Sequence, residues 1–170
     1  MVEAECRGII MKHNDDKTNV MRLLEQKKIK YVMHSYVDTG AVSGIDVANV
    51  LGQNPAMVFK TLVTVGKSKQ HYVFLVPVEK ELDLKKAARC VEEKKIDMLK
   101  SKELLGLTGY IHGGCSPIGM KKTFRTFIDN SAGNFEHIIF SGGRIGYQVE
   151  ISLLELNKIL KYELADIAVE

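Results

Sequence analysis

The chain has no long apolar segment. None of its runs approaches the roughly 18 apolar residues that a membrane-spanning helix requires. Its first residues, MVEAECRGIIMKHNDDK, also lack the apolar core and the small-residue cleavage site of a secretory signal peptide. We therefore expect a cytoplasmic protein without a membrane segment.

Cysteine is scarce and scattered. The three cysteines are Cys6, Cys90 and Cys115, and their spacings match no CxxC metal or redox pattern. An odd number of cysteines also argues against a framework of disulfides. The sequence thus predicts a reducing compartment.

The common motifs of metal and cofactor sites are missing. There is no HExxH and no paired acidic motif, and His34, His71 and His112 are too dispersed to suggest a metal site. No Ser/His/Asp order, Walker loop or dinucleotide fingerprint is present either. We therefore expect neither a metal nor a cofactor, and a site poor in acid–base groups.

The composition that remains is typical of one globular domain. Of the 170 residues, 45% are hydrophobic and 26% are charged. The formal charge of +3 permits a nucleic-acid partner without demanding one. Either Thr18 or Asn19 could cap the first helix, and Asp83 could cap a later one. Periodicity predicts helices at 19–28, 45–51, 84–91, 98–107 and 153–160, and strands at 31–36, 58–65, 71–78, 125–131, 136–141 and 146–152. Because the two kinds of element do not alternate regularly, the predicted fold is a single α+β domain.

One lysine stands in an apolar strand. The stretch VFKTLVTV, residues 58–65, carries apolar side chains on both alternating faces, and Lys60 lies among them. Burying an ammonium group without a partner costs several kcal/mol. Lys60 should therefore contact an acidic side chain, open into a cleft or meet an anionic ligand. Alternatively, it is an edge lysine whose stem follows the sheet while its head reaches water.

A glycine-rich stretch, GYIHGGCSPIGMKK, occupies residues 109–122. Residues 110–111 are expected to end a strand. Gly113 and Gly114 allow positive φ and close approach of the backbone, and Pro117 restricts the exit of the loop. Such a loop can direct several backbone N–H groups at one oxygen.

Two functions are open for this loop. Clustered N–H groups bind phosphate, carboxylate or a developing oxyanion, and Lys121 and Lys122 follow to hold a phosphate nearby. The alternative is an ordinary tight turn. Cys115 is also a candidate nucleophile, since a thiol needs a base or a positive setting and His112 is near it in sequence. That proximity by itself is weak support.

Several stretches together resemble the YbaK/EbsC family of bacterial aminoacyl-tRNA deacylases. The pairing of FKT with a GxxxP loop, in this order and at this distance, is the specific part of the resemblance. The similar segments are HSY (34–36), VFKTLV (58–63), VPVEKELDLKKAA (76–88), TGYIHGGCSPIGMKK (108–122), FIDNSA (127–132) and FSGGRIGYQVEI (140–151). The resemblance implies an editing domain over residues 18–165, after a lead of residues 1–17.

The resemblance implies a mixed β-sheet flanked by helices, as in the editing domain inserted into bacterial prolyl-tRNA synthetases. It also implies hydrolysis of the ester between a wrongly attached amino acid and the terminal adenosine of tRNA, typically in Cys-tRNA(Pro). Mischarged tRNA is then the substrate, and prolyl-tRNA synthetase a possible partner.

Carried over residue by residue, the resemblance assigns catalytic roles to Lys60, Gly113 and Gly114. Contacts with tRNA phosphates are expected for Lys121 and Lys122. The expected substrate-binding residues are Tyr36, Phe59, Thr61, Cys115, Ser116, Pro117, Ser141, Gly142 and Gln148.

One position departs from the family pattern. Better-known members carry an aspartate where this chain has Gln148, and an amide cannot supply the charge of a carboxylate. The departure weakens any pairing of this position with Lys60 or with the α-ammonium of the substrate. Glu150 shares the same strand face and is a candidate substitute.

The expected mechanism suits a site with little acid–base machinery, because an aminoacyl ester is already activated. Loop N–H groups would hold the carbonyl oxygen, Lys60 would anchor the ribose or phosphate, and the thiol of the substrate would attack its own carbonyl. The enzyme is then a hydrolase, or a lyase if a cyclic thiolactone leaves. The alternatives are an Ala-tRNA(Pro) deacylase that uses water, and a non-catalytic module that binds tRNA ends or nucleotides.

Overall fold

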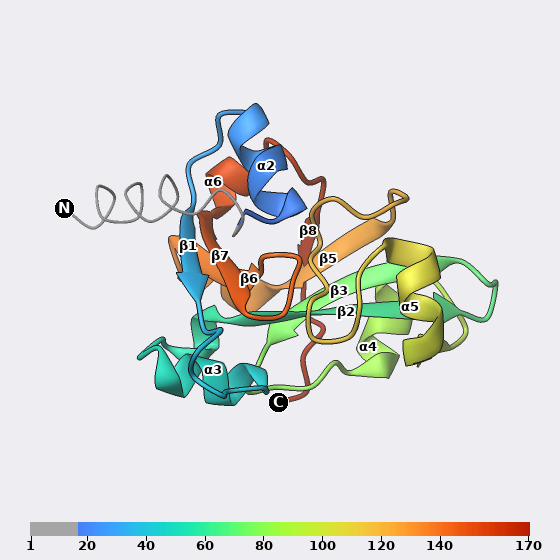
Figure 1. The fold of residues 1–170 in the computed structure, drawn as a ribbon. Helices are drawn as coiled ribbons and strands as arrows, with labels where there is room; N and C mark the ends of the chain where they lie inside the picture. Colours follow the sequence, from blue (N-terminus) through green and yellow to red (C-terminus); the bar gives the residue numbers. More distant parts are fainter. Residues whose placement is uncertain (1–16) are drawn as a thin grey trace.

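The computed structural model describes residues 17–170, which form two β-sheets with helices packed around them (Figure 1). Apart from Lys17, the predicted lead of residues 1–17 lies outside the described residues. The α-helices are α2 (Asn19–Gln26), α3 (Gly44–Val50), α4 (Leu84–Cys90), α5 (Ser101–Thr108) and α6 (Leu153–Leu156), and the 3-10 helices are η2 (Pro55–Met57) and η3 (Asn130–Asn134). The strands are β1 (Val32–Ser35), β2 (Phe59–Gly66), β3 (His71–Pro77), β4 (Ile96–Met98), β5 (Arg125–Asp129), β6 (His137–Ser141), β7 (Tyr147–Ser152) and β8 (Glu163–Ala165).

The larger sheet is mixed. Its strand order is β4-β2-β3-β5-β8, with β2 antiparallel to β3 and β4, and β5 parallel to β3 and β8. The smaller sheet, β1-β7-β6, is antiparallel throughout. A parallel bridge between Val58 and Ile139 joins the two sheets. The predicted α+β class is therefore confirmed.

Local signals located several elements correctly. The predicted hairpin is present, because Phe59 pairs with Pro77 and Val65 with His71 across β2 and β3. The side chain of Thr18 accepts a hydrogen bond from the N–H of Met21 at 3.2 Å and begins α2. The carboxylate of Asp83 does the same for α4, accepting from the N–H groups of residues 85–86 at 3.0 Å. Capping residues thus acted as predicted.

Other elements differ from the prediction. Residues 110–111 belong to the loop after α5 and to no strand. The last predicted helix ends at Leu156, and residues 159–160 turn back onto the core. Met98 lies in β4 rather than in a helix, and β8 was not predicted. Three-residue edge strands such as β4 and β8 are stabilised by pairing with a neighbouring strand. They are too short to show the alternation of apolar and polar residues that would predict a strand.

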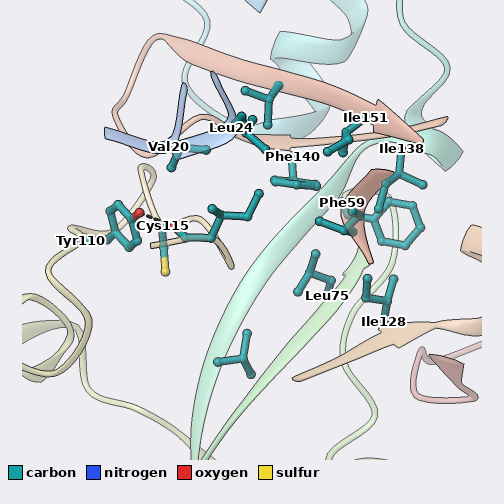
Figure 2. Packing of buried hydrophobic residues seen from close by; sticks show 14 of the residues in the cluster. Val20, Leu24, Phe59, Leu75, Tyr110, Cys115, Ile128, Ile138, Phe140 and Ile151 are labelled. Carbon is teal, nitrogen blue, oxygen red and sulfur yellow. Dashed lines mark hydrogen bonds between the residues drawn. The ribbon is translucent and has the colours of Figure 1, made fainter. Parts of the chain in front are cut away.

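Both faces of the larger sheet are covered. In β3, Val73 and Leu75 point into a core between the two sheets, while Phe74 and Val76 pack under α4 and the C-terminal segment. Figure 2 shows the first of these clusters, with Phe59 and Phe140 brought together from β2 and β6. This packing explains why both faces of β2 are apolar, as the sequence indicated.

Within residues 17–170, no helix is both long and apolar enough to cross a membrane.

Candidate functional site

A cavity of about 580 Å³ opens where the first half of β2 meets the loop after α5 and the β6–β7 turn. Its size lies within the usual range of small-molecule sites, roughly 300–1,000 Å³. We call it the editing cavity, after the editing family that the motifs on its wall resemble. Of the expected site residues, it is lined by Tyr36, Phe59, Lys60, Thr61, Gly113, Cys115, Ser141 and Gln148. Five separate segments of the chain supply these residues, and the fold brings them to one place.

The remaining expected residues lie around the editing cavity without lining it. Ser116 is fully buried, and its Oγ accepts from the N–H of Ile118 at 3.3 Å. Gly142 closes the β6–β7 turn by donating its N–H to the carbonyl of Tyr147 at 2.8 Å. Neither residue lines the cavity, and their expected contact with the substrate stays a prediction.

The two lysines of the glycine-rich stretch also point elsewhere. The N–H of Lys121 donates to the carbonyl of Thr108 at 3.0 Å, and its side chain lies along Gly109. Lys122 and Pro117 line a different cavity. Both lysines are exposed, so they can reach a phosphate only outside the editing cavity.

Lys60 has an acidic partner. Its Nζ donates to Oε1 of Glu81 at 3.0 Å, and its side chain is only 28% exposed. Lys60 is also one of the residues that line the cavity. Two of the roles expected for a lysine in an apolar strand are therefore combined, since it meets a carboxylate and it opens into a cleft.

Thr61 offers polar atoms to the editing cavity in two ways. Hydrogen-bonded pairs alternate along antiparallel strands, and the N–H of Val78 donates to the carbonyl of Val58 at 2.8 Å. By this alternation, the backbone N–H and C=O groups of Thr61 point away from β3, toward the other edge of β2. Strand β4 pairs with that edge only from Thr64 onward. Its Oγ1 is buried and has no hydrogen-bond partner within residues 17–170. A buried hydroxyl on a cavity wall without a partner points to a ligand, because leaving it unpaired costs about 1–3 kcal/mol.

The loop after α5 is held by its own hydrogen bonds. The N–H of Gly114 donates to the carbonyl of Ile111 at 3.0 Å, so this donor belongs to the turn. The hydroxyl of Tyr110 donates to the carbonyl of Ile118 in a short bond. Gly113 adopts φ +88°, a conformation that favours glycine. Gly113 and Cys115 line the cavity, whereas Gly114 does not and its N–H is used within the turn.

Cys115 is a poor nucleophile where it stands. It is 9% exposed, and burial raises the pKa of its thiol to about 12. Figure 2 shows its sulfur beside Tyr110 at the edge of the apolar cluster. A thiolate forms readily in a positive, partly exposed setting, and this position is apolar and closed. The thiol is thus largely protonated at neutral pH.

Gln148 is oriented by a second amide. Its Oε1 accepts from Nε2 of Gln53 at 2.8 Å, and only 5% of the residue is exposed. Glu150 does not line the editing cavity, because its carboxylate lies 2.9 Å from Nε2 of His34 and 3.4 Å from Nδ1 of His137. The substitution of Glu150 for the missing aspartate, considered from the sequence, is therefore not what the structure shows.

Tyr36 and Ser141 are fixed by the turns on which they lie. The N–H of Tyr36 donates to the carbonyl of Gly146 at 2.8 Å, which ties the end of β1 to the β6–β7 turn. The Oγ of Ser141 accepts from the N–H of Gly143 at 3.1 Å. Both residues line the editing cavity.

The cavity also has walls that the sequence did not single out. His112, which the sequence suggested only as a base near Cys115, lines the cavity as well. Gly44 and Val78 approach so closely that a Cβ on Gly44 would lie 2.5 Å from the valine side chain. No motif marks that contact. The other unpredicted wall residues are Val42, Ser43, Val47, Val58, Leu62, Val63, Met98, Leu99, Ser101, Leu104, Phe140 and Tyr147.

Among residues 17–170, no group of three or more His, Cys, Asp or Glu side chains is arranged to hold a metal ion.

The chain is similar to proteins of one family. The model of the aminoacyl-tRNA editing domain matches residues 39–159. A protein of Enterococcus faecalis named "Putative Cys-tRNA(Pro)/Cys-tRNA(Cys) deacylase EbsC" is 44% identical over 142 residues, which make up 83% of this chain and 87% of that protein.

Solved structures agree in fold. The structure of "a putative trans-editing enzyme for prolyl tRNA synthetase" is 25% identical, with a TM-score of 0.77 over 89% of this chain and 95% of that one. The hypothetical protein APE2540 is 19% identical, with a TM-score of 0.78 over 89% of this chain and all of the other, and shares the fold. Because the family model spans well over half of the sequence and a relative is 44% identical, the chain belongs to the aminoacyl-tRNA editing domain family, the YbaK/EbsC family whose motifs it carries.

Proposed function

We propose that this protein is an aminoacyl-tRNA deacylase that removes cysteine from mischarged tRNA, with Cys-tRNA(Pro) as its main substrate. Membership of the editing family supports deacylation of aminoacyl-tRNA. The name of the Enterococcus faecalis relative supports cysteine as the amino acid. The name of the 25% identical structure supports action beside prolyl-tRNA synthetase, as a separate editing factor.

The observation that carries the proposal is the content of the editing cavity. Lys60, Thr61 and Gly113 line one cavity, and the hydroxyl of Thr61 is buried without a hydrogen-bond partner within residues 17–170. The thiol on the wall of that space is buried and its pKa is raised to about 12. Such a site can place an ester and stabilise charge, and it needs a nucleophile from elsewhere.

In the proposed mechanism, the N–H groups of Gly113 and Cys115 hold the carbonyl oxygen of the ester as it becomes negative. Losing one donor of this kind typically costs about 2.7–4 kcal/mol of transition-state stabilisation. Gly114 acts on this geometry indirectly, because its own N–H closes the turn with Ile111. Lys60 holds the terminal ribose or its phosphate, which takes the place of Glu81.

The nucleophile is the thiol of the substrate. Its sulfur bonds to the carbonyl carbon, the bond from that carbon to the ribose oxygen breaks, and the thiol proton ends on the released ribose hydroxyl. The products are a cyclic thiolactone and free tRNA, and water opens the thiolactone afterwards. Cysteine suits this reaction, since a few per cent of a free thiol is already thiolate at pH 7.

Two variants test the mechanism. Lys60→Ala should reduce deacylation of Cys-tRNA(Pro) at least a hundredfold, and Lys80→Ala, an exposed lysine outside the cavity, should leave it unchanged. Cys115→Ala should retain most of the activity. If Lys60→Ala keeps wild-type rates while Cys115→Ala abolishes them, a cysteine hydrolase is correct and the substrate-assisted scheme is wrong.

A panel of esters tests the substrate. Cys-tRNA(Pro) should react far faster than Ser-tRNA(Pro) or Ala-tRNA(Pro), because only its side chain is a good internal nucleophile. Mass spectrometry of the first product should detect the thiolactone, which separates a lyase from a hydrolase. Equal rates on alanine and cysteine esters would favour attack by water, and binding without turnover on every ester would favour a non-catalytic module.

A further inference from the structure

A second cavity, of about 550 Å³, borders the same loop as the editing cavity. Its lining comes from residues 117–126 and 159–163, and it shares no residue with the editing cavity. Cys115 lines the first cavity and Pro117 the second. Two residues of extended chain span at most about 7 Å, so the two sites are neighbours across the loop.

The second cavity combines an apolar wall with a basic rim. Lys122, Arg125 and Lys161 supply positive charge, and Glu163 is the acidic residue in its lining. Arg125 is drawn toward Glu163 at 3.8 Å, so the two exposed lysines carry the excess charge. The apolar and aromatic part of the wall consists of Ile118, Met120, Phe124, Ile159, Leu160 and Tyr162.

We propose that this second cavity binds the unpaired nucleotide that precedes the terminal adenosine of the tRNA substrate. The inference rests on the proposed function, and it adds a nucleotide subsite for single-stranded RNA. Sites for single-stranded nucleic acid combine a positive groove, which follows the phosphates, with aromatic side chains on which bases stack. Phe124 and Tyr162 supply the aromatic surfaces, and Lys122 and Lys161 supply the charge.

The loop between the two cavities acts as a fixed spacer. The N–H of Lys121 donates to the carbonyl of Thr108 at 3.0 Å, which fastens the loop to the end of α5. The hydroxyl of Tyr110 donates to the carbonyl of Ile118, and the N–H of Ile118 donates to Oγ of Ser116. The parts of the loop that border the two cavities are therefore held in fixed positions relative to each other.

The test compares substrates that do and do not reach the second cavity. Cysteinyl-adenosine fills the editing cavity only, whereas the cysteinyl ester of the trinucleotide CCA extends beyond it. The variant Lys122→Glu/Lys161→Glu should raise KM for the trinucleotide and for Cys-tRNA(Pro) at least tenfold, with kcat retained. Cysteinyl-adenosine should be hydrolysed as by the wild type.

A matched control changes the same charge elsewhere. Lys67→Glu/Lys94→Glu alters two exposed lysines that line neither cavity, and it should change KM for the trinucleotide less than twofold. Binding of uncharged CCA, followed by fluorescence anisotropy, gives a readout without catalysis. Loss of two phosphate contacts in the cavity variant should flatten the slope of log K against log salt by about 1.4.

A third variant addresses stacking. Phe124→Leu keeps an apolar side chain and removes the ring, so affinity for CCA should fall roughly tenfold while cysteinyl-adenosine is unaffected. Thermal unfolding of this variant shows whether the loss of affinity comes from a loss of folded protein.

The outcomes separate this inference from the proposed function. If the wild type hydrolyses no ester but binds CCA through Lys122 and Lys161, the deacylase proposal fails and the nucleotide site stands. If the cavity variant and the control variant weaken CCA binding equally, or if cysteinyl-adenosine is affected as strongly as the trinucleotide, the nucleotide site is wrong. Binding of a free mononucleotide as tightly as CCA would also overturn it, in favour of a small-molecule site.

Discussion

The Nζ of Lys60 lies 3.0 Å from Oε1 of Glu81, and the two side chains differ greatly in exposure. The lysine is 28% exposed on the wall of the editing cavity, whereas the glutamate is 80% exposed on the loop between β3 and α4. An ion pair this open to water contributes only about 0–1 kcal/mol. Glu81 therefore holds the lysine weakly, in a position where a phosphate can replace the carboxylate.

Glu81→Gln should improve substrate binding slightly. The change removes the competing charge and keeps the shape of the side chain, so KM for Cys-tRNA(Pro) should fall by roughly two- to fivefold. The free energy of unfolding should change by less than about 0.5 kcal/mol. Steady-state kinetics beside Glu79→Gln, an exposed neighbour, gives the comparison. A large loss of kcat would show instead that Glu81 positions Lys60 for the reaction.

Two glycines near the site should respond oppositely to alanine. A Cβ on Gly114 would lie 3.1 Å from the backbone N of Ile145, so the β6–β7 turn must move. Gly114→Ala should cost about 1–3 kcal/mol of stability and reduce kcat. Gly106 lies in helix α5 with nothing within 4 Å of an added Cβ, so Gly106→Ala should stabilise by about 0.5–1 kcal/mol. Urea unfolding of both variants measures the contrast, which equal effects would contradict.

The thiol of Cys115 should alkylate slowly and with an unusual pH profile. In a Cys6→Ser/Cys90→Ser variant, iodoacetamide can react with Cys115 alone. Because burial raises the pKa of Cys115 to about 12, the thiolate fraction should still grow about tenfold per pH unit between pH 7 and 9. An unperturbed thiol levels off near pH 8.5. Mass spectrometry follows the rate, and the urea-unfolded chain is the control. A plateau of the alkylation rate near pH 8.5 in the folded protein would contradict the burial of this thiol.

Glu150 should stabilise the folded protein near neutral pH and lose this contribution in acid. The hydrogen bond from His34 lowers the pKa of the Glu150 carboxyl, against the opposing effect of burial. A carboxyl whose folded pKa is lowered stabilises the protein above its ordinary pKa of about 4.3. That stability is lost as the pH falls through the folded pKa.

Urea unfolding between pH 7 and pH 3 measures this contribution. Glu150→Gln should flatten the fall in unfolding free energy below about pH 4.5, relative to the wild type. Glu136→Gln, which changes an exposed carboxyl, should keep the wild-type slope. Parallel curves for the wild type and Glu150→Gln would show that the contacts with His34 and His137 do not couple to folding.

Much of the local structure follows from the sequence. Thr18 and Asp83 begin helices, and the two β-branched runs around residues 66–70 form the hairpin of β2 and β3. These features depend on neighbours a few residues apart, which a single sequence displays directly. The lysine in the FKT motif was recognisable for the same reason, since a charge in an apolar strand is a local anomaly.

Contacts between distant segments could not be read in this way. Gln53 orients Gln148 although the two are 95 positions apart in sequence, and no local pattern around either residue predicts this contact. Strands β4 and β8 form because β2 and β5 offer them edges. The N–H of Gly114 closes the turn instead of facing the editing cavity, and the direction of a donor depends on backbone dihedrals that composition does not specify.

From the sequence alone we could read the residue types of the site, the capped helices, the central hairpin and the resemblance to the editing family. The tertiary structure decided which of those residues share a cavity, that Glu81 pairs with Lys60, and that the thiol of Cys115 is buried. The reason is physical: burial, pKa and the geometry of a cavity arise from packing between segments that are remote in the chain, whereas caps and turns arise within a few residues.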